Sequence, residues 1–136
     1  MIVLPQAIAA RIEEYLRGEE GEELGIDKEA RSHGALALMG TIGMIWGLRP
    51  DGTFWMFDED FEVELAPLPA DCETQALVWG ARRFPWLAEL LPVRGSCNGD
   101  CTGCRGSGFL SATWMCPRCD GLGWLRETVP SEGGAA

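Results

Sequence analysis

The sequences Cys101-Thr-Gly-Cys104-Arg-Gly106-Ser-Gly108 and Cys116-Pro-Arg-Cys119-Asp-Gly121-Leu-Gly123 repeat one pattern, CxxCxGxG, near the end of a chain of 136 residues. Two residues between paired cysteines allow one tight turn to aim both sulfurs at a single ion, and two such turns supply four thiolates. The glycines after each second cysteine accept positive φ, which turns backbone amides toward the sulfur. Eleven residues separate the pairs, which leaves room for two short strands. We therefore predict a metal-clasped β-hairpin.

The predicted metal ligands are the four cysteines of these repeats, Cys101, Cys104, Cys116 and Cys119. Four thiolates in a tetrahedron are a set that structural Zn²⁺ prefers, so we expect one structural zinc ion. Iron in a rubredoxin-like site suits the same ligands, and spacing alone does not separate the two metals. A structural zinc site contributes about 10–16 kcal/mol of apparent binding energy at neutral pH, so the segment should unfold without metal.

In these two repeats the chain resembles the cysteine-rich zinc region of DnaJ-type co-chaperones, whose repeat is also CxxCxGxG. The resemblance covers residues 97–124 and implies that the four repeat cysteines bind zinc. That family carries four repeats and two zinc ions, whereas the two repeats here supply ligands for one. The chain also lacks the His-Pro-Asp of a J domain, because its one histidine, His33, precedes Gly34. The resemblance therefore implies an assembly chaperone or a protein-interaction module and no stimulation of a chaperone ATPase.

Two further cysteines lie outside the repeats. Cys97 stands four residues before Cys101; we expect a spare surface thiol, with ligand exchange or redox chemistry as alternatives. Cys72 lies on the apolar side of a predicted helix, where a buried and inert thiol is expected. A thiol–disulfide redox switch that uses Cys97 with the CxxC pairs is the enzyme-class alternative for the whole protein.

No catalytic motif accompanies the cysteines. The sequence contains no phosphate-binding loop, nucleotide fingerprint or HExxH. Carboxylate pairs such as Asp58 with Asp60, or Glu13 with Glu14, have no nucleophile in a recognisable pattern beside them, and solvated turns explain them. We therefore predict that the protein is not an enzyme and that it binds another protein.

Charge is distributed unevenly along the chain. The formal net charge is −10, and residues 1–80 hold 16 acidic against 5 basic residues. Such a surface repels nucleic acid and favours a basic protein as partner, although a solvated face that keeps the protein soluble explains it as well. Residues 81–136 hold 5 acids and 6 bases, which leaves one weaker alternative, a zinc ribbon that binds nucleic acid through Arg94, Arg105, Arg118 and Arg126.

No secretory signal or membrane span is expected. The longest uncharged run, residues 34–48, has 15 residues with four glycines, short of the roughly 18 apolar residues that indicate a membrane helix. Paired cysteines with CxxC spacing are typical of metal ligation in a reducing compartment. We expect a soluble, cytoplasmic protein.

The first 92 residues predict an α+β fold, with a small antiparallel sheet packed on two or three helices. Ile8, Ile12 and Tyr15 follow helical spacing between Pro5, which fits a first helical turn, and Gly18; a second helix is expected over 27–32. Alternation and turn residues, including Arg49-Pro-Asp-Gly52, predict strands over 35–39, 42–49, 53–57 and 61–65, after which prolines 67 and 69 close the sheet.

A helix that Asp71 caps and a further turn that begins at Pro85 follow the sheet, as one kinked helix or two short ones. The helix carries Ala76, Trp79 and Arg83, and Trp86, Leu87, Leu90 and Leu91 of the further turn are expected to face inward. Four tryptophans fall on faces predicted to be core, and an aromatic contact surface is the alternative; they are Trp46, Trp55, Trp79 and Trp86.

The predicted domains are an α+β domain over 1–92, the zinc hairpin over 93–127 and a flexible tail over 128–136. The segment Trp46-Gly-Leu-Arg-Pro-Asp-Gly-Thr-Phe-Trp-Met-Phe57 resembles the strand-turn-strand of bacterial SUKH immunity proteins. That resemblance implies an alternative function, in which the acidic domain neutralises a basic toxin by charge complementarity.

Overall fold

The computed structural model describes residues 2–18, 25–41, 44–57, 66–96, 98–112 and 114–125. The chain divides into two compact units, Met1–Leu90 and Leu91–Ala136. We call the first unit the body and the second the cysteine module, and each is described by itself. No helix among the described residues is long and apolar enough to cross a membrane.

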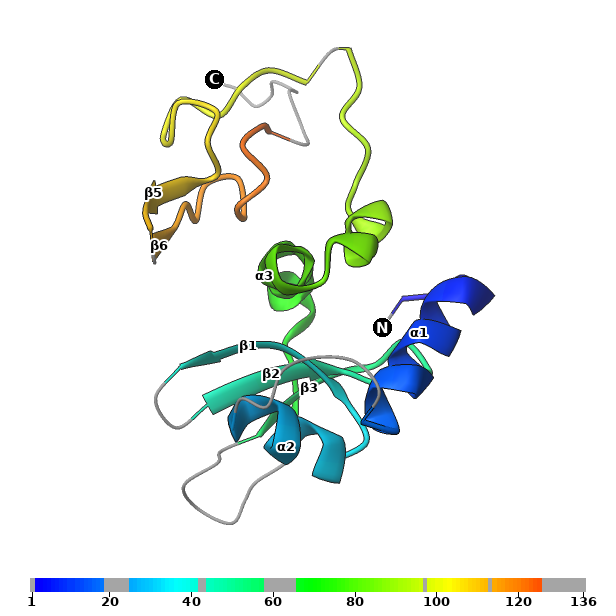
Figure 1. Ribbon diagram of the computed structural model, residues 1–136. Coiled ribbons are helices and arrows are strands. Elements are labelled where there is room, and N and C mark those ends of the chain that lie inside the picture. The colour runs from blue at the N-terminus through cyan, green and yellow to red at the C-terminus, as the bar shows by residue number, and fades with distance from the viewer. Residues whose placement is uncertain are drawn as a thin grey trace. The chain divides into compact units, whose positions relative to one another are not determined.

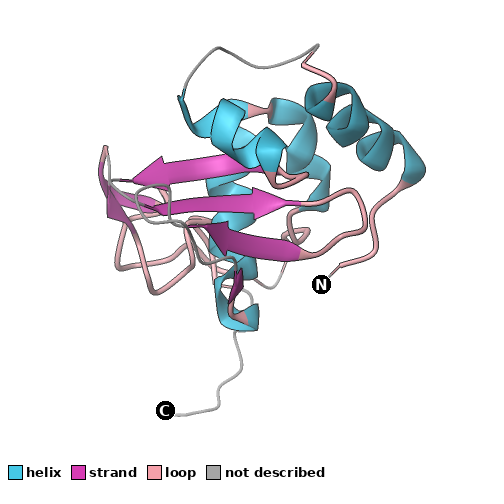
Figure 2. Ribbon diagram, turned by 90° about the horizontal axis from the view of Figure 1, so that it is seen from below, coloured by secondary structure: helices cyan, strands magenta, loops and turns pink. Residues whose placement is uncertain are grey.

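The body is α+β, as predicted, and is built on one antiparallel sheet with the strand order β1-β2-β3-β4. Neighbouring strands run in opposite directions (Figure 2). The bounds of the strands are β1 (Leu36–Thr41), β2 (Met44–Leu48), β3 (Phe54–Phe57) and β4 (Ala66–Pro67). The first three coincide closely with the strands expected over 35–39, 42–49 and 53–57.

The fourth strand differs from the prediction. The strand expected over 61–65 lies outside the described residues, and Pro67 does not close the sheet but belongs to β4, where it pairs with Trp55. Proline has no N–H to donate to a neighbouring strand, so an edge strand such as β4 is the place in a sheet that accepts it.

A tight turn joins β2 to β3, as the sequence predicts. The N–H of Gly52 donates to the carbonyl of Arg49 over 2.9 Å, and the N–H of Arg49 donates to the carbonyl of Thr53 over 2.9 Å. Gly52 has φ +89°, and a Cβ there would lie 2.0 Å from the carbonyl oxygen of Ile2. Only glycine fits this position, because a side chain would strain the backbone and collide with the N-terminal segment.

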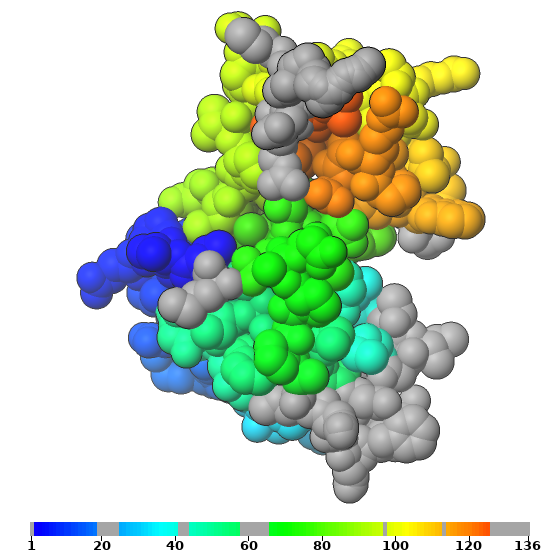
Figure 3. All heavy atoms as spheres, turned by 180° about the vertical axis from the view of Figure 1, so that it is seen from behind, coloured from blue at the N-terminus to red at the C-terminus, as the bar shows by residue number. Residues whose placement is uncertain are grey.

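Three α-helices pack with the sheet (Figure 1): α1 (Gln6–Leu16), α2 (Gly25–Ser32) and α3 (Glu73–Arg83). All three contact β1, and the space-filling view from behind shows the green side chains of α3 over the sheet (Figure 3). Pro5 occupies the position just before α1 and not its first turn, and Gly18, with φ +82°, follows its end.

The start of α3 also differs from the prediction. Asp71 does not cap the helix: it lies in a short 3-10 turn, Ala70–Cys72, and Cys72 occupies the position before the first helical residue. A second 3-10 helix, Pro85–Leu90, follows α3. Phe84 between them is extended, because the residue before a proline is disfavoured in the helical conformation.

The tryptophans expected in the core are only partly buried. Aliphatic residues, phenylalanines and Tyr15 fill the core instead. Three of the tryptophans lie under arginines, with guanidinium-to-ring distances of 4.9 Å for Arg11 over Trp86, 4.6 Å for Arg49 over Trp55 and 5.5 Å for Arg82 over Trp79. A large ring with a polar edge suits the border between core and water, where it can also hold a cation.

A buried polar network ties the three helices to β1. The carboxylate of Asp27 on α2 is fully buried and receives the hydroxyl of Tyr15 from α1. It also receives Nη2 of Arg83 from α3, at 3.1 Å and 2.9 Å to its two oxygens. Sequence reasoning placed Arg83 on this helix with Ala76 and Trp79 but did not identify Asp27 as its partner.

The same network makes hydrogen bonds to both backbone polar groups of Ala37 in β1. The N–H of Ala37 donates to the Tyr15 hydroxyl over 3.3 Å, and its carbonyl accepts Nη1 of Arg83 over 2.7 Å. A strand at the edge of a sheet leaves such groups unpaired, and leaving them unpaired in a buried position costs free energy. Side chains of the network therefore make the hydrogen bonds to Ala37 that a further strand would otherwise make.

Replacement of Asp27 tests this network. Asp27→Asn leaves the buried end of Arg83 without its counter-charge, so we expect the free energy of unfolding of the body to fall by about 3–5 kcal/mol. Urea unfolding followed by far-ultraviolet circular dichroism measures it, because the α-helices lie in the body. Glu14→Gln, an exposed change on α1, is the matched control and should change stability by less than about 0.5 kcal/mol. Equal effects of the two variants would contradict the network.

Tyr15 provides a second test, because it is the one tyrosine in the chain. Burial, and then the hydrogen bond to Asp27, raise the pKa of Tyr15 well above the usual value of about 10. The stabilisation from the protonated hydroxyl is therefore complete below about pH 10 and is lost as the pH rises further. We expect tyrosinate absorbance to emerge only as the body unfolds in alkali. A titration midpoint near 10 in a protein whose circular dichroism is unchanged would refute this placement of Tyr15.

Candidate metal centre

The four predicted ligands lie on two similar turns at the ends of a hairpin. Cys101 and Cys104 lie on a turn before β5 (Phe109–Ser111), and Cys116 and Cys119 lie on a turn after β6 (Trp114–Met115). The two strands pair antiparallel, with Phe109 opposite Met115. This is the C-terminal hairpin that the sequence predicts.

The structure brings all four sulfurs together. Their Sγ atoms lie within 4.8 Å of one another, with 3.8 Å between those of Cys101 and Cys116 and 3.7 Å between those of Cys104 and Cys119. A tetrahedron of sulfurs about 2.3 Å from a central ion has edges of about 3.8 Å, whereas a disulfide joins two sulfurs at about 2.05 Å. The four thiols are free and buried, and they can hold a metal ion.

Backbone amides point at two of the sulfurs, as the glycine pattern predicts. The N–H of Gly108 donates to Sγ of Cys104 over 3.1 Å, and the N–H of Gly123 donates to Sγ of Cys119 over 3.2 Å. Both glycines have positive φ, +88° and +89°. Each hydrogen bond stabilises negative charge on the sulfur that accepts it.

The two repeats also hold each other across an approximate twofold relation. The N–H of Cys116 donates to the carbonyl of Gly108, and the N–H of Cys101 donates to the carbonyl of Gly123, each over 3.0 Å. A Cβ on Gly108 would lie 2.4 Å from the carbonyl oxygen of Gly121. The last glycine of each repeat is thus required for the close approach of the other repeat as well as for its own φ.

The thiols of Cys104 and Cys119 have pKa values that are shifted in opposite directions. Burial disfavours both thiolates, but the amide of Gly108 and the thiol of Cys119 favour that of Cys104 and lower its pKa to about 7. At Cys119 burial prevails and raises the pKa to about 12. Negative charge in this pair is therefore favoured on Cys104, and a metal cation bound to both sulfurs would displace the thiol protons.

Polar side chains make hydrogen bonds within residues 94–100 and from this segment to Leu125 near the end of the module. Nη2 of Arg94 lies 2.7 Å from Oδ1 of Asp100, and its Nε donates to the carbonyl of Asn98 over 3.1 Å. The side-chain amide of Asn98 donates to the carbonyl of Leu125 over 3.0 Å. Sequence reasoning missed both residues, because no pattern links Asn98 to Leu125, 27 positions later, and a single aspartate six positions after Arg94 forms no recognisable motif.

The other candidate residues lie elsewhere. Cys97 falls outside the described residues, as do Asp58 and Asp60. Cys72 is half-buried in the body, and His33 stacks on Phe57 with ring centroids 4.6 Å apart. Within the part of the chain that the structure describes, no other group of three or more histidine, cysteine or acidic side chains gathers in this way.

Four protein ligands fill a tetrahedral site. Catalytic zinc sites keep one of the four positions for water or substrate, and structural sites use all four for side chains. With four side chains for one ion, the set formed by Cys101, Cys104, Cys116 and Cys119 matches the second kind. An ion bound there would hold two turns of the chain together.

Comparison of the chain with protein-family models, curated proteins and solved structures finds no match. The resemblance to the zinc region of DnaJ-type co-chaperones therefore depends on the two CxxCxGxG repeats themselves. The resemblance of residues 46–57 to SUKH immunity proteins stays an expectation from sequence.

Gly108 and Gly103 have different surroundings and give a matched pair of alanine variants. Gly108→Ala places a Cβ 2.4 Å from a carbonyl oxygen at φ +88°, whereas Gly103→Ala meets nothing closer than 3.5 Å. The left-handed backbone alone costs about 1–2 kcal/mol, so we expect Gly108→Ala to lose its metal to a chelator at a concentration that leaves wild type and Gly103→Ala loaded. Equal metal retention in both variants would show that the repeats do not interlock as described.

Proposed function

We propose that this chain is a non-enzymatic protein-interaction module, of the assembly chaperone or adaptor kind, in which one structural zinc ion bound by Cys101, Cys104, Cys116 and Cys119 holds the cysteine module in shape. The observation that carries the proposal is the spacing of the buried sulfurs, 3.7 Å and 3.8 Å along two edges of the cluster. These distances suit four thiolates around one Zn²⁺. The likeness of the repeats to a zinc-binding family supports zinc over iron.

The closed ligand set supports a structural role for the metal. An ion with four cysteine ligands has no free position for a substrate or an activated water, so the site offers binding geometry and no Lewis-acid chemistry. A redox switch needs thiolates that a partner thiol or oxidant can reach. The four thiols are buried: Cys104, the most accessible of them, is 7% exposed.

The body supplies the charge that favours a protein partner. Residues 1–90 hold 17 acidic and 7 basic side chains. A field of this sign attracts a basic protein surface and accelerates its association, and it repels nucleic acid. A basic protein region is therefore the partner that we propose for the body.

The metal ligands are tested by Cys101→Ser. We expect this variant to lose its zinc and to lose hydrogen-exchange protection across residues 97–124, because the ion is the main support of that segment. The body should keep its protection, since its core is independent of the sulfurs. Elemental analysis by mass spectrometry and hydrogen exchange measure the two effects.

Cys72→Ser is the matched control, because Cys72 lies in the body, outside the cluster of four sulfurs. It should keep one zinc per chain. Intact metal stoichiometry in Cys101→Ser would contradict the ligand assignment. Iron in the purified wild-type protein would show that the site is rubredoxin-like and not a zinc site. Wild-type protein that is free of metal and forms reversible disulfides would favour the redox switch.

A further inference from the structure

Two large apolar side chains stand exposed on the hairpin of the cysteine module. Trp114 on β6 is 66% exposed and Leu110 on β5 is 50% exposed. The neighbouring residues Phe109 and Met115 pair with each other, and Met115 is buried. Successive side chains of a strand point to opposite faces, so Leu110 and Trp114 belong to the outer face of the hairpin.

The register of the hairpin brings these two side chains together. Phe109 pairs with Met115 and Ser111 pairs with Trp114, so β5 has one residue more than β6 between the two pairs. That extra residue is Leu110, which therefore lies beside Trp114 across the strands. Tryptophan is enriched among the residues that anchor protein interfaces, and an exposed tryptophan beside a leucine is unfavourable in water.

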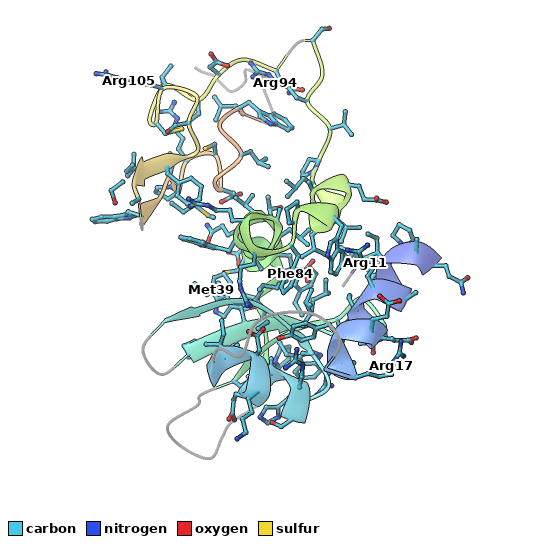
Figure 4. The ribbon with its side chains drawn as sticks, in the orientation of Figure 1. Arg11, Arg17, Met39, Phe84, Arg94 and Arg105 are labelled. Carbon is cyan, nitrogen blue, oxygen red and sulfur yellow. The ribbon has the colours of Figure 1, made fainter. Side chains whose placement is uncertain are left out.

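Two arginines lie in the turns that flank the hairpin. From Cys101 to Cys119 the only charged side chains besides the thiolates are Arg105 and Arg118; of the acidic residues just outside this segment, Asp100 pairs with Arg94 and Asp120 is partly buried. Both arginines are exposed, and Arg105 extends away from the ribbon (Figure 4). Neither makes an ion pair with another described residue. The sulfur charges, in contrast, are buried and are met by the amides of Gly108 and Gly123.

The hairpin is also held in place before any partner arrives. Its two ends continue into the turns that carry Cys104 and Cys116, whose sulfurs belong to the metal cluster. A surface that is fixed in advance loses little conformational entropy when it binds. Metal binding at the sulfurs therefore prepares the outer face of the hairpin for docking.

We propose that the outer face of the β5–β6 hairpin docks a segment of another protein that carries large apolar side chains with carboxylates beside them. Leu110 and Trp114 receive the apolar side chains, and Arg105 and Arg118 pair with the carboxylates. This inference rests on the proposed function, because the zinc centre holds the hairpin. The partner segment of the module is therefore acidic, whereas the partner that the acidic body favours is basic.

A protein segment suits this surface better than a nucleic acid. Binding to phosphates depends on several cations that release counterions, and the turns beside the hairpin offer two, Arg105 and Arg118. The whole chain has a net charge of −10, which repels a polyanion along its length. A short segment with a few carboxylates gains the local attraction of the two arginines without that long-range repulsion.

The proposal is tested with an array of short random peptides probed with fluorescent, zinc-loaded, full-length protein. Peptides that bind wild type but lose about 30-fold or more in affinity for Trp114→Ser should be enriched in leucine, isoleucine or phenylalanine together with aspartate or glutamate. Leu110→Ser should weaken the same peptides. Arg105→Asn, whose new residue tolerates the positive φ at that position, and Arg118→Gln should each weaken them by about two- to fivefold.

Val93→Ser and Arg17→Gln are the matched controls. Val93 is an apolar residue of the same module that is 90% exposed but lies outside the hairpin, and Arg17 is an exposed arginine of the body. Neither change should alter peptide binding. The proposal is overturned if zinc-loaded wild type binds no peptide in a way that depends on Trp114 and Leu110, or if the dependent peptides are basic. Competition by single-stranded DNA that disappears at high salt would assign the surface to nucleic acid instead.

The metal content of each variant distinguishes a failure of the zinc site from a failure of the docking surface. Trp114 and Leu110 are exposed and should retain one zinc per chain when replaced. Loss of peptide binding with full zinc supports the docking surface. Absence of zinc from wild type would refute the proposed function, whereas full zinc without Trp114-dependent binding would refute this inference alone.

Discussion

Four sulfur atoms form the core of the cysteine module. The buried cluster of this unit consists of Cys101, Cys104, Cys116 and Cys119, and Leu125 packs against it. So small an apolar core does not offset the conformational entropy lost when a glycine-rich segment becomes ordered. In the function that we propose, bonds from one ion to four thiolates offset this loss, and the glycine turns, the hairpin and the ion pair of Arg94 are arranged around the four sulfurs.

The body is stabilised in a different way. Its core is apolar, and Asp27, the one buried charged group among its described residues, belongs to a network that joins α1, α2, α3 and the edge of β1. None of these contacts involves the four sulfurs. Under the function that we propose, removal of the metal is therefore expected to disorder the module alone, and with it the exposed face that carries Trp114.

The parts that follow local rules were predictable from sequence. The hairpin and its ligands follow from the spacing of cysteine and glycine, and β2 and β3 follow from the turn at Gly52. Asp27 was not predictable, because nothing local separates it from the other acidic residues and no pattern links it to Arg83, 56 positions later. Asp71 resembles a helix cap in sequence, but the 3-10 turn around it places Cys72 at the cap position.

The identity of the metal is not encoded in the ligand spacing, because zinc and iron accept the same four thiolates. X-ray absorption spectroscopy of the purified full-length protein at the zinc edge identifies both the metal and its ligand atoms. We expect one zinc per chain with a single shell of four sulfurs at about 2.3 Å. Nitrogen or oxygen in that shell, or a protein without zinc, would contradict it.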